Sequence, residues 1–176
     1  MRALLDWLFP RLCIACRSAV TGIDGKFGLC PRCESDLLPV DRAPACGRCG
    51  ERLPAGQICA PCALEPPPYG KLFALWLYEP PARELIHAFK FHRLDYLGLA
   101  LGQALGEKVR RASAERSLPD LVVPMPLAWT RRLLRGFNQA EIVASALAHE
   151  IGRPAHRVLG RRVAFVHQTG RTRRQR

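Results

Sequence analysis

The chain has 176 residues, enough for one ordinary domain with a small module or for two small domains. No apolar run approaches the roughly 20 residues that cross a bilayer, so the sequence predicts a soluble protein without membrane insertion. The formal net charge is +12 at pH 7, and residues 131–176 contribute +9 of it through 11 Arg against Glu141 and Glu150. Arg binds phosphate oxygens through a planar fork, so this charge predicts a phosphate-bearing partner, either nucleic acid or a phosphorylated metabolite.

Residues 1–9 predict a short helix, because their leucines repeat at nearly helical spacing and Pro10 ends the pattern. Asp6 and Trp7 interrupt the apolar stretch, and no small-residue cleavage site precedes the first cysteine. The stretch therefore does not have the features of a secretory signal.

The cysteines carry the strongest pattern in the chain. Two thiols three positions apart can bind one metal ion from the same side, and a second such pair completes a tetrahedron. The sequence has four Cys-x-x-Cys pairs, and no cysteine follows them: Cys13/Cys16, Cys30/Cys33, Cys46/Cys49 and Cys59/Cys62. This pattern predicts two zinc ions, each held by four cysteines. It also predicts a cytoplasmic protein, because thiols must stay reduced to bind metal.

Other interpretations of the cysteines are a disulfide scaffold, which is typical of small secreted domains, and a redox motif, which usually occurs once beside a strand and a helix. The pairing over two zinc ions also has two solutions. Either the first pair joins the second and the third joins the fourth, or the pairs interleave. A spacer at residues 39–44 favours the sequential solution. Because the module has few large apolar residues, we expect the metal to supply most of its folding free energy.

Residues 65–70 contain three consecutive Pro and predict a stiff linker between a zinc module at 1–64 and a second domain at 71–176. In the second domain, residues 71–78 predict a buried strand. A helix follows from about Glu79, and another is predicted over residues 94–109.

A short core strand is predicted at residues 121–123, followed by a basic loop. Asn138, with Glu141 three positions later, resembles a capping box and predicts a helix that runs to about Ile151, where Gly152 stops it. Further strands are predicted at residues 158–159 and 163–166. This alternation of strands and helices predicts an α/β layer architecture.

The basic loop and the start of the following helix form the second candidate site. A helix N-terminus offers free N–H groups and a partial positive charge, and Arg side chains beside it favour a phosphate or pyrophosphate ligand. The candidate residues for phosphate or nucleic acid are Arg131, Arg132, Arg135, Gly136, Asn138 and Gln139. The alternative is a solvated basic turn before an ordinary helix. Trp129 is most simply a core or interface residue, although it could also stack on a base.

With these motifs in place, the chain resembles the ComF family of competence and DNA-utilisation proteins. The matching segments are the cysteine pattern, Tyr78–His87 with Lys90-Phe91, Pro124–Leu127, Arg135-Gly136-Phe137-Asn138-Gln139-Ala140-Glu141 and Gln168–Gly170. The resemblance implies a small metal-stabilised double zinc ribbon followed by an α/β phosphoribosyltransferase-like domain. It also implies a role in DNA uptake or utilisation, with single-stranded DNA as ligand and competence or DNA-processing proteins as possible partners.

One family element is absent. The resemblance implies an Asp-Asp-x-x-Thr-Thr-Gly loop that holds phosphoribosyl pyrophosphate (PRPP), and this sequence has no two adjacent acidic residues. We therefore expect an incomplete, C-terminally truncated transferase-like domain without catalytic residues, inactive as this chain. The alternatives are a phosphoribosyltransferase acting on PRPP, if the chain continues past Arg176, and a zinc-ribbon adaptor that binds only protein.

Overall fold

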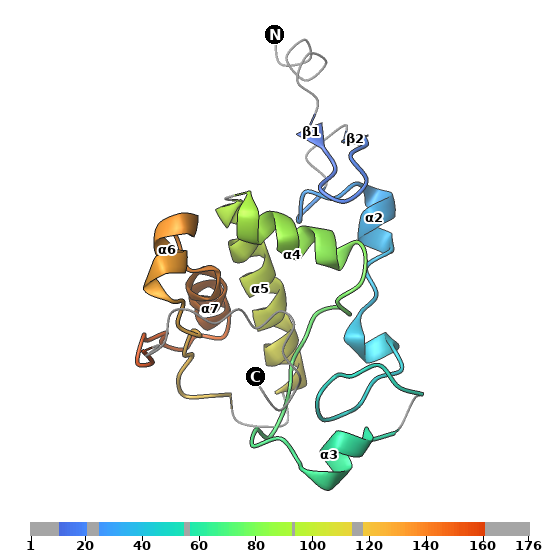
Figure 1. Cartoon of the computed structure of the whole chain (residues 1–176), viewed down its shortest axis with the longest axis vertical. Helices are drawn as coiled ribbons and strands as arrows, with labels where there is room; N and C mark the ends of the chain where they lie inside the picture. Colours follow the sequence, from blue (N-terminus) through green and yellow to red (C-terminus); the bar gives the residue numbers. More distant parts are fainter. Residues whose placement is uncertain (1–10, 21–24, 55–56, 93, 114–117, 161–176) are drawn as a thin grey trace.

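The computed structural model describes residues 11–20, 25–54, 57–92, 94–113 and 118–160 (Figure 1). The helix expected at residues 1–9 and the strand expected at residues 163–166 lie outside these ranges. None of the helices in the described ranges has both the length and the apolar composition of a membrane-spanning segment.

The N-terminal part consists of short elements around the cysteines. Strand β1 (Arg11–Leu12) pairs antiparallel with β2 (Ala19–Val20), with Arg11 opposite Val20. Helix α2 (Pro31–Ser35), the 3-10 turn η1 (Val40–Arg42) and helix α3 (Ala60–Leu64) follow. Helices α2 and α3 each carry Pro in the first turn, where its missing N–H costs no hydrogen bond.

Residues 71–78 were expected to form a buried strand, and they form an extended segment with a single bridge instead. Trp76 pairs with Pro39 of the spacer, Val40 N–H donates to Leu75 O at 3.2 Å, and Leu77 N–H donates to Leu38 O at 3.0 Å. Within the described ranges the segment pairs only with residues 38–40, so its backbone hydrogen bonds do not extend into a β-ladder. The segment therefore connects the zinc module to the helices without building a sheet.

Three helices form the main body of the second half: α4 (Ala82–Phe91), α5 (Asp95–Ala112) and α7 (Gln139–Glu150). All three were predicted, although α5 extends past the expected end at residue 109. Helix α7 ends at Glu150, close to the expected end at about Ile151, and Gly152 follows with a φ of +65° that suits a residue without Cβ. The basic loop is in fact partly helical, because α6 spans Trp129–Arg135 and ends at Gly136 with φ of +80°.

Helices α5 and α7 approach closely along a row of glycines. A Cβ at Gly98 would lie 2.7 Å from Ile142 Cγ2, one at Gly102 would lie 2.5 Å from Val143 O, and one at Gly106 would lie 2.6 Å from Glu150 Cβ. The contact at Gly102 is to the backbone of α7. The two helices can therefore approach this closely only because the residues on this face of α5 are glycines, which have no Cβ.

The largest hydrophobic core joins the first cysteine group to the helices. Leu29, Leu85, Leu97 and Cys13 are fully buried in one cluster, and Figure 1 shows the segment around β1, β2 and α2 beside α4. The module thus buries more apolar surface than its composition suggested, because α4 and α5 supply the other half of the core. Around the second cysteine group the buried cluster contains only Cys46, Cys59 and Cys62, with Cys49 and Leu53 packed against it.

Beyond residue 70 the described chain is therefore mostly helical. The strand expected at residues 121–123 is an isolated parallel bridge between Val122 and Ala155, and residues 158–159 are not a strand. The only named strands in the described ranges are β1 and β2. The α/β layers expected from the sequence need strands that pair with several neighbours, and the described segments offer one neighbour each.

Candidate functional site

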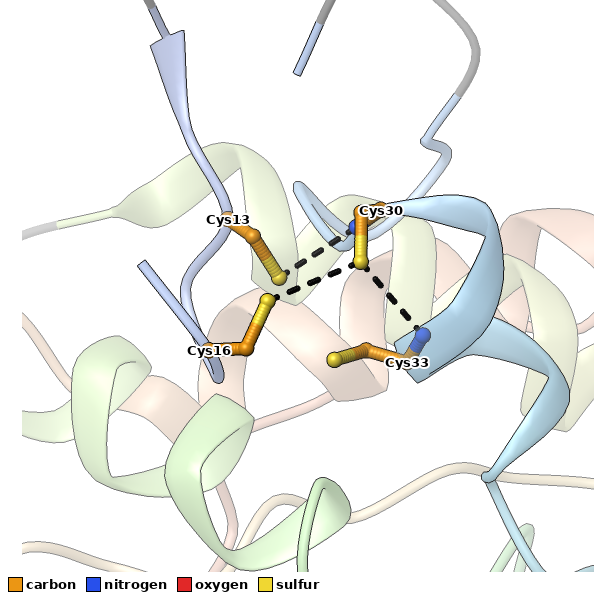
Figure 2. Close-up of side chains that lie close together, drawn as sticks. All are labelled: Cys13, Cys16, Cys30 and Cys33. Atoms are coloured by element: carbon orange, nitrogen blue, oxygen red, sulfur yellow. Dashed lines mark hydrogen bonds between the residues drawn. The ribbon is translucent and has the colours of Figure 1, made fainter. Parts of the chain in front are cut away.

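The first cysteine group brings together two loops that are distant in sequence (Figure 2). Cys13 and Cys16 come from the turn between β1 and β2, and Cys30 and Cys33 come from the start of α2. Their four sulfurs lie within 4.8 Å of one another, and Cys16 Sγ is 3.7 Å from Cys30 Sγ. The cysteine pairs therefore combine in sequential order, first with second.

The second group repeats the first in its backbone as well as its ligands. In both turns the first cysteine N–H donates to the residue five positions on: Cys13 to Ser18 O at 2.8 Å, and Cys46 to Glu51 O at 2.7 Å. In both groups the third cysteine precedes a short helix and its N–H donates to the first cysteine's sulfur, at 3.3 Å from Cys30 and 3.5 Å from Cys59. Two copies of one scaffold thus hold Cys13/16/30/33 and Cys46/49/59/62.

The geometry of both groups fits zinc. A tetrahedral ion with Zn–S bonds of about 2.3 Å separates its sulfurs by about 3.8 Å, and the structure has 3.7 Å between Cys16 and Cys30 and 3.6 Å between Cys49 and Cys59. All eight cysteines are free, and a disulfide would need about 2 Å. Backbone N–H groups that point at the sulfurs stabilise thiolates. The two four-cysteine groups therefore fit two zinc ions, which would cross-link each turn to the helix that follows it.

The thiols of each group differ strongly in acidity. Hydrogen bonds from Ser18 lower the pKa of Cys16 to about 6, and hydrogen bonds from backbone N–H groups, chiefly that of Cys59, lower the pKa of Cys46 to about 6. Burial, with crowding by the neighbouring thiols, raises the pKa of Cys33 above its ordinary value and that of Cys62 to about 12. Each group therefore contains at least one thiol that is more acidic than usual, and a thiol with a raised pKa that loses its proton when a cation binds.

The three arginines of the basic segment all lie on α6 or at its end, and they differ in their contacts. Arg132 lies 3.7 Å from a carboxylate oxygen of Glu141 on α7. Arg135 packs over the Phe91 ring at 5.2 Å and donates to Gln139 Oε1 at 3.4 Å. Arg131 forms no ion pair with any described residue. Burial lowers the pKa of Arg135, and the nearby charge of Arg131 adds to this effect.

The remaining candidate residues, Asn138, Gln139 and Gly136, have structural contacts or backbone roles within the protein. Asn138 is buried, accepts a hydrogen bond from Ala140 N–H at 3.1 Å and donates to Met125 O at 3.1 Å. Gln139 is also buried and donates to Lys90 O at 3.4 Å. Asn138 therefore caps α7 as predicted, and both side chains connect α7 to neighbouring segments. Gly136 terminates α6 in a left-handed conformation.

Three contacts of these sites were not anticipated from the sequence. Ser18 Oγ lies 3.3 Å from Cys16 Sγ, and the only signal for it was a hydroxyl two positions after a ligand cysteine. Glu141, the expected capping-box partner, instead pairs with Arg157 at 2.8 Å and with Arg132. No sequence pattern indicates the ion pair between Glu141 and Arg157, because Arg157 follows the end of α7.

Comparisons with known proteins bear on both halves of the chain. The family described as "Double zinc ribbon domain" matches residues 4–63. The "DNA utilization protein YhgH" of Salmonella typhi is 36% identical over 149 residues, which are 81% of this chain and 63% of that protein. The protein of the same name from Escherichia coli (strain K12) is 35% identical over 144 residues, or 79% of this chain and 61% of that protein.

A third relative is the "Competence protein F" of Haemophilus influenzae, which is 31% identical over 145 residues, or 81% of this chain and 61% of the relative. The chain thus spans a little over three-fifths of the length of these relatives. No solved structure matches it significantly.

Proposed function

Because this chain carries a double zinc ribbon and is a member of the ComF family, as its motifs predicted, we propose that it acts in DNA uptake or utilisation by binding single-stranded DNA. The printed names of the relatives support the process, and the charge distribution supports the ligand. In this proposal the zinc ribbons hold the N-terminal part together, and the Arg-rich second half contacts phosphates.

The observation that carries the proposal is the surface of α6. Trp129 is 65% exposed, and Arg131 and Arg132 follow it on the same short helix. An exposed aromatic ring beside two arginines can stack on a base while the guanidinium groups bind the adjacent phosphates.

Within this site we assign direct phosphate contact to Arg131 and Arg132. The side chain of Arg135 already packs on Phe91, so it orients the end of α6 and contributes charge. Asn138 and Gln139 have their hydrogen-bonding groups engaged within the protein, and we assign them a positioning role. Gly136 allows α6 to end directly before α7.

The experiment is a titration of fluorescein-labelled oligothymidylate at several salt concentrations, read by fluorescence anisotropy. We expect a steep loss of affinity between low and physiological salt. The triple variant R131A/R132A/R135A should bind at least about tenfold more weakly and have a shallower salt slope, because each lost phosphate contact reduces the slope by about 0.7. Zinc content should stay unchanged.

A matched control is the triple variant R32A/R42A/K71A, which removes the same charge from exposed positions outside α6. It should bind within about twofold of the original chain at physiological salt, since distant charges are screened. Absence of binding, or a flat salt dependence, would favour a zinc-ribbon adaptor that recognises only protein.

A phosphoribosyltransferase acting on PRPP is the second candidate, favoured by the segment Arg135–Glu141 at the start of α7. It requires residues 71–176 to form a phosphoribosyltransferase-like α/β domain, separate from a zinc module at 1–64 and a linker at 65–70. We propose that the 176-residue chain does not turn over PRPP. If the purified chain released pyrophosphate from PRPP, transferase activity would be supported as its function in place of DNA binding.

The proposal also includes competence or DNA-processing proteins as partners and a cytoplasmic location.

A further inference from the structure

A cleft of about 850 Å³ lies between the turn that carries Cys13 and Cys16 and helix α4. We call it the ribbon–helix cleft. One wall comes from β1, β2 and the cysteine turn between them. The other comes from α4, the segment before it and the start of α5. Ligand sites of small molecules typically have volumes of about 300–1,000 Å³, so the cleft has room for one.

Both walls carry cationic side chains. Arg11 and Arg17 line the ribbon wall, and Arg83 lines the helix wall beside the imidazole rings of His87 and His92. The only carboxylate among the described lining residues is Glu84, and one of its oxygens accepts from Arg83 at 3.0 Å. Arg11 and Arg17 form no ion pair within the described ranges. Among the described lining residues three arginines face this one carboxylate, so their net charge is positive and favours an anion.

The interior of the cleft is apolar and two tyrosines border it. Ile14, Leu29 and Leu94 line it, together with Tyr78 and Tyr96. Tyr78 is 64% exposed and Tyr96 is 49% exposed, so both rings are available to a ligand. A phosphate group alone would not use apolar side chains or rings. A flat heterocycle that carries a phosphate would use both the cations and the rings.

The backbone at Arg17 is an independent sign of function. Arg17 is the only described non-glycine residue with positive φ, at +63°. The equivalent position in the second cysteine group is Gly50, at +73°, which adopts this conformation without a steric penalty. A long side chain at a position that favours glycine is unfavourable for folding. Residues in such backbone conformations cluster at functional sites.

We propose that the ribbon–helix cleft binds one nucleotide of a single-stranded nucleic acid, with its phosphate on Arg11 and Arg17 and its base against Tyr78 or Tyr96. This inference deepens the proposed function and rests on it, since the ligand is the same strand, but it uses no residue of α6. Binding at both places gives the strand two contacts, and the zinc ribbon becomes part of the binding surface instead of only a structural support.

The test compares two double variants in the anisotropy titration with oligothymidylate of about 12 nucleotides, a length within single-strand site sizes. R11Q/R17G removes two cleft arginines, and glycine at position 17 suits the local backbone. R32Q/R42Q removes two exposed arginines that do not line the cleft. We expect R11Q/R17G to lower affinity about tenfold and R32Q/R42Q to change it less than about twofold. Bound zinc, measured in each variant, shows that the ribbons remain folded.

A third variant, Y78A/Y96A, tests stacking at unchanged charge and should weaken binding about tenfold while keeping the salt slope. Equal losses in R11Q/R17G and R32Q/R42Q, or original affinity in R11Q/R17G, would overturn the cleft assignment. If the R131A/R132A/R135A variant is weak while R11Q/R17G binds normally, the proposed function stands and the cleft inference fails. If the original chain does not bind the strand, the proposed function itself fails.

Free thymidine monophosphate distinguishes a strand from a single nucleotide as the source of the ligand. Competition only at millimolar concentration supports a strand, because the second contact then supplies most of the affinity. Competition at micromolar concentration would overturn the strand and indicate a free nucleotide. Polyglutamate that displaces the oligonucleotide equally well at equal charge would show a general anion surface and would also overturn the proposal.

Discussion

Arg17 and Gly50 occupy the same position in the two cysteine turns and have the same left-handed backbone conformation. This conformation carries a steric penalty for arginine and none for glycine. Each has positive φ, and each N–H donates to the first cysteine's carbonyl oxygen, at 3.0 Å and 2.9 Å. At Gly50 a Cβ would also meet Leu72 Cδ2 at 3.2 Å. A side chain at this position therefore destabilises the two turns by different amounts, although their zinc ligands are equivalent.

We predict that G50A weakens zinc binding at the second group and lowers the unfolding free energy by about 1 kcal/mol, because alanine disfavours left-handed backbone. R17G should change it less, since relief of strain offsets the greater freedom of glycine in the unfolded chain. Zinc release to a chelator, followed for both variants, gives two phases to compare. Equal weakening by both substitutions would contradict the equivalence of the turns.

Zinc affinity should fall with decreasing pH, because protons compete with the ion for sulfur. Thiols with raised pKa, such as Cys62 at about 12, hold a proton at neutral pH when the site is empty and release it on binding. Affinity therefore rises with pH across the neutral range. Below about pH 6 even Cys16 and Cys46 take up protons in the empty state, and affinity should fall more steeply.

Titration against a chromophoric chelator at pH 5.5, 7 and 8 measures this dependence. S18A offers a control, since loss of the hydroxyl should raise the pKa of Cys16 and weaken only the first group at low pH. Affinity that is constant from pH 5.5 to pH 8 would contradict the thiolate assignment.

At the scale of elements, the contact between α5 and α7 depends on the glycine face. We predict that G102A destabilises the protein by about 1–3 kcal/mol, because the added Cβ meets backbone atoms of α7 that cannot move independently. Helix propensity alone favours alanine by about 1 kcal/mol, so the expected sign is opposite to that of an isolated helix. Urea denaturation followed by circular dichroism measures the change.

The control is Q103A, one position further along the exposed side of α5, which should leave stability unchanged or raise it slightly. If G102A proves as stable as Q103A, the two helices do not pack through this face.

Prediction from sequence was most successful for elements with their own local signals. Helix α7 was expected because Asn138 can cap it and Gly152 can end it, and both do. Helix α6 was missed because it is only seven residues long and its N-cap, Ala128, has no side chain to accept a hydrogen bond. Arg135 packing on Phe91, from α4, helps to hold it, and such a contact leaves no trace in the local sequence.

At the scale of the whole molecule, the two cysteine groups have unequal importance. The first lies in the main core with Leu29, Leu85 and Leu97, whereas the buried cluster of described residues at the second consists of its own cysteines with Leu53 packed against them. Loss of metal from the first group should therefore reach the helices. Loss from the second should remain local.

We predict that C33S lowers the unfolding free energy by about 4 kcal/mol or more and reduces zinc from two ions to one. The matched variant is C62S, because Cys62 is buried at the equivalent position of the second group. This variant should also bind one zinc ion instead of two. Its helices should nevertheless melt within a few degrees of the original. Thermal melts at 222 nm with elemental analysis compare the two, and an equal loss of helix stability would contradict the shared core.

Local patterns in the sequence were sufficient to predict the two four-cysteine groups, the three longer helices and the family resemblance. These depend on ligand chemistry, helical periodicity and motifs, all of which act over short stretches of chain. Which of these groups contact one another could be seen only in the three-dimensional structure. Gln139 turns inward to the carbonyl oxygen of Lys90, 49 positions away, and the first zinc ribbon packs on α4 to form a shared core and a cationic cleft. Such contacts join segments that are distant in the chain, so their free energy is set by packing and not by local pattern.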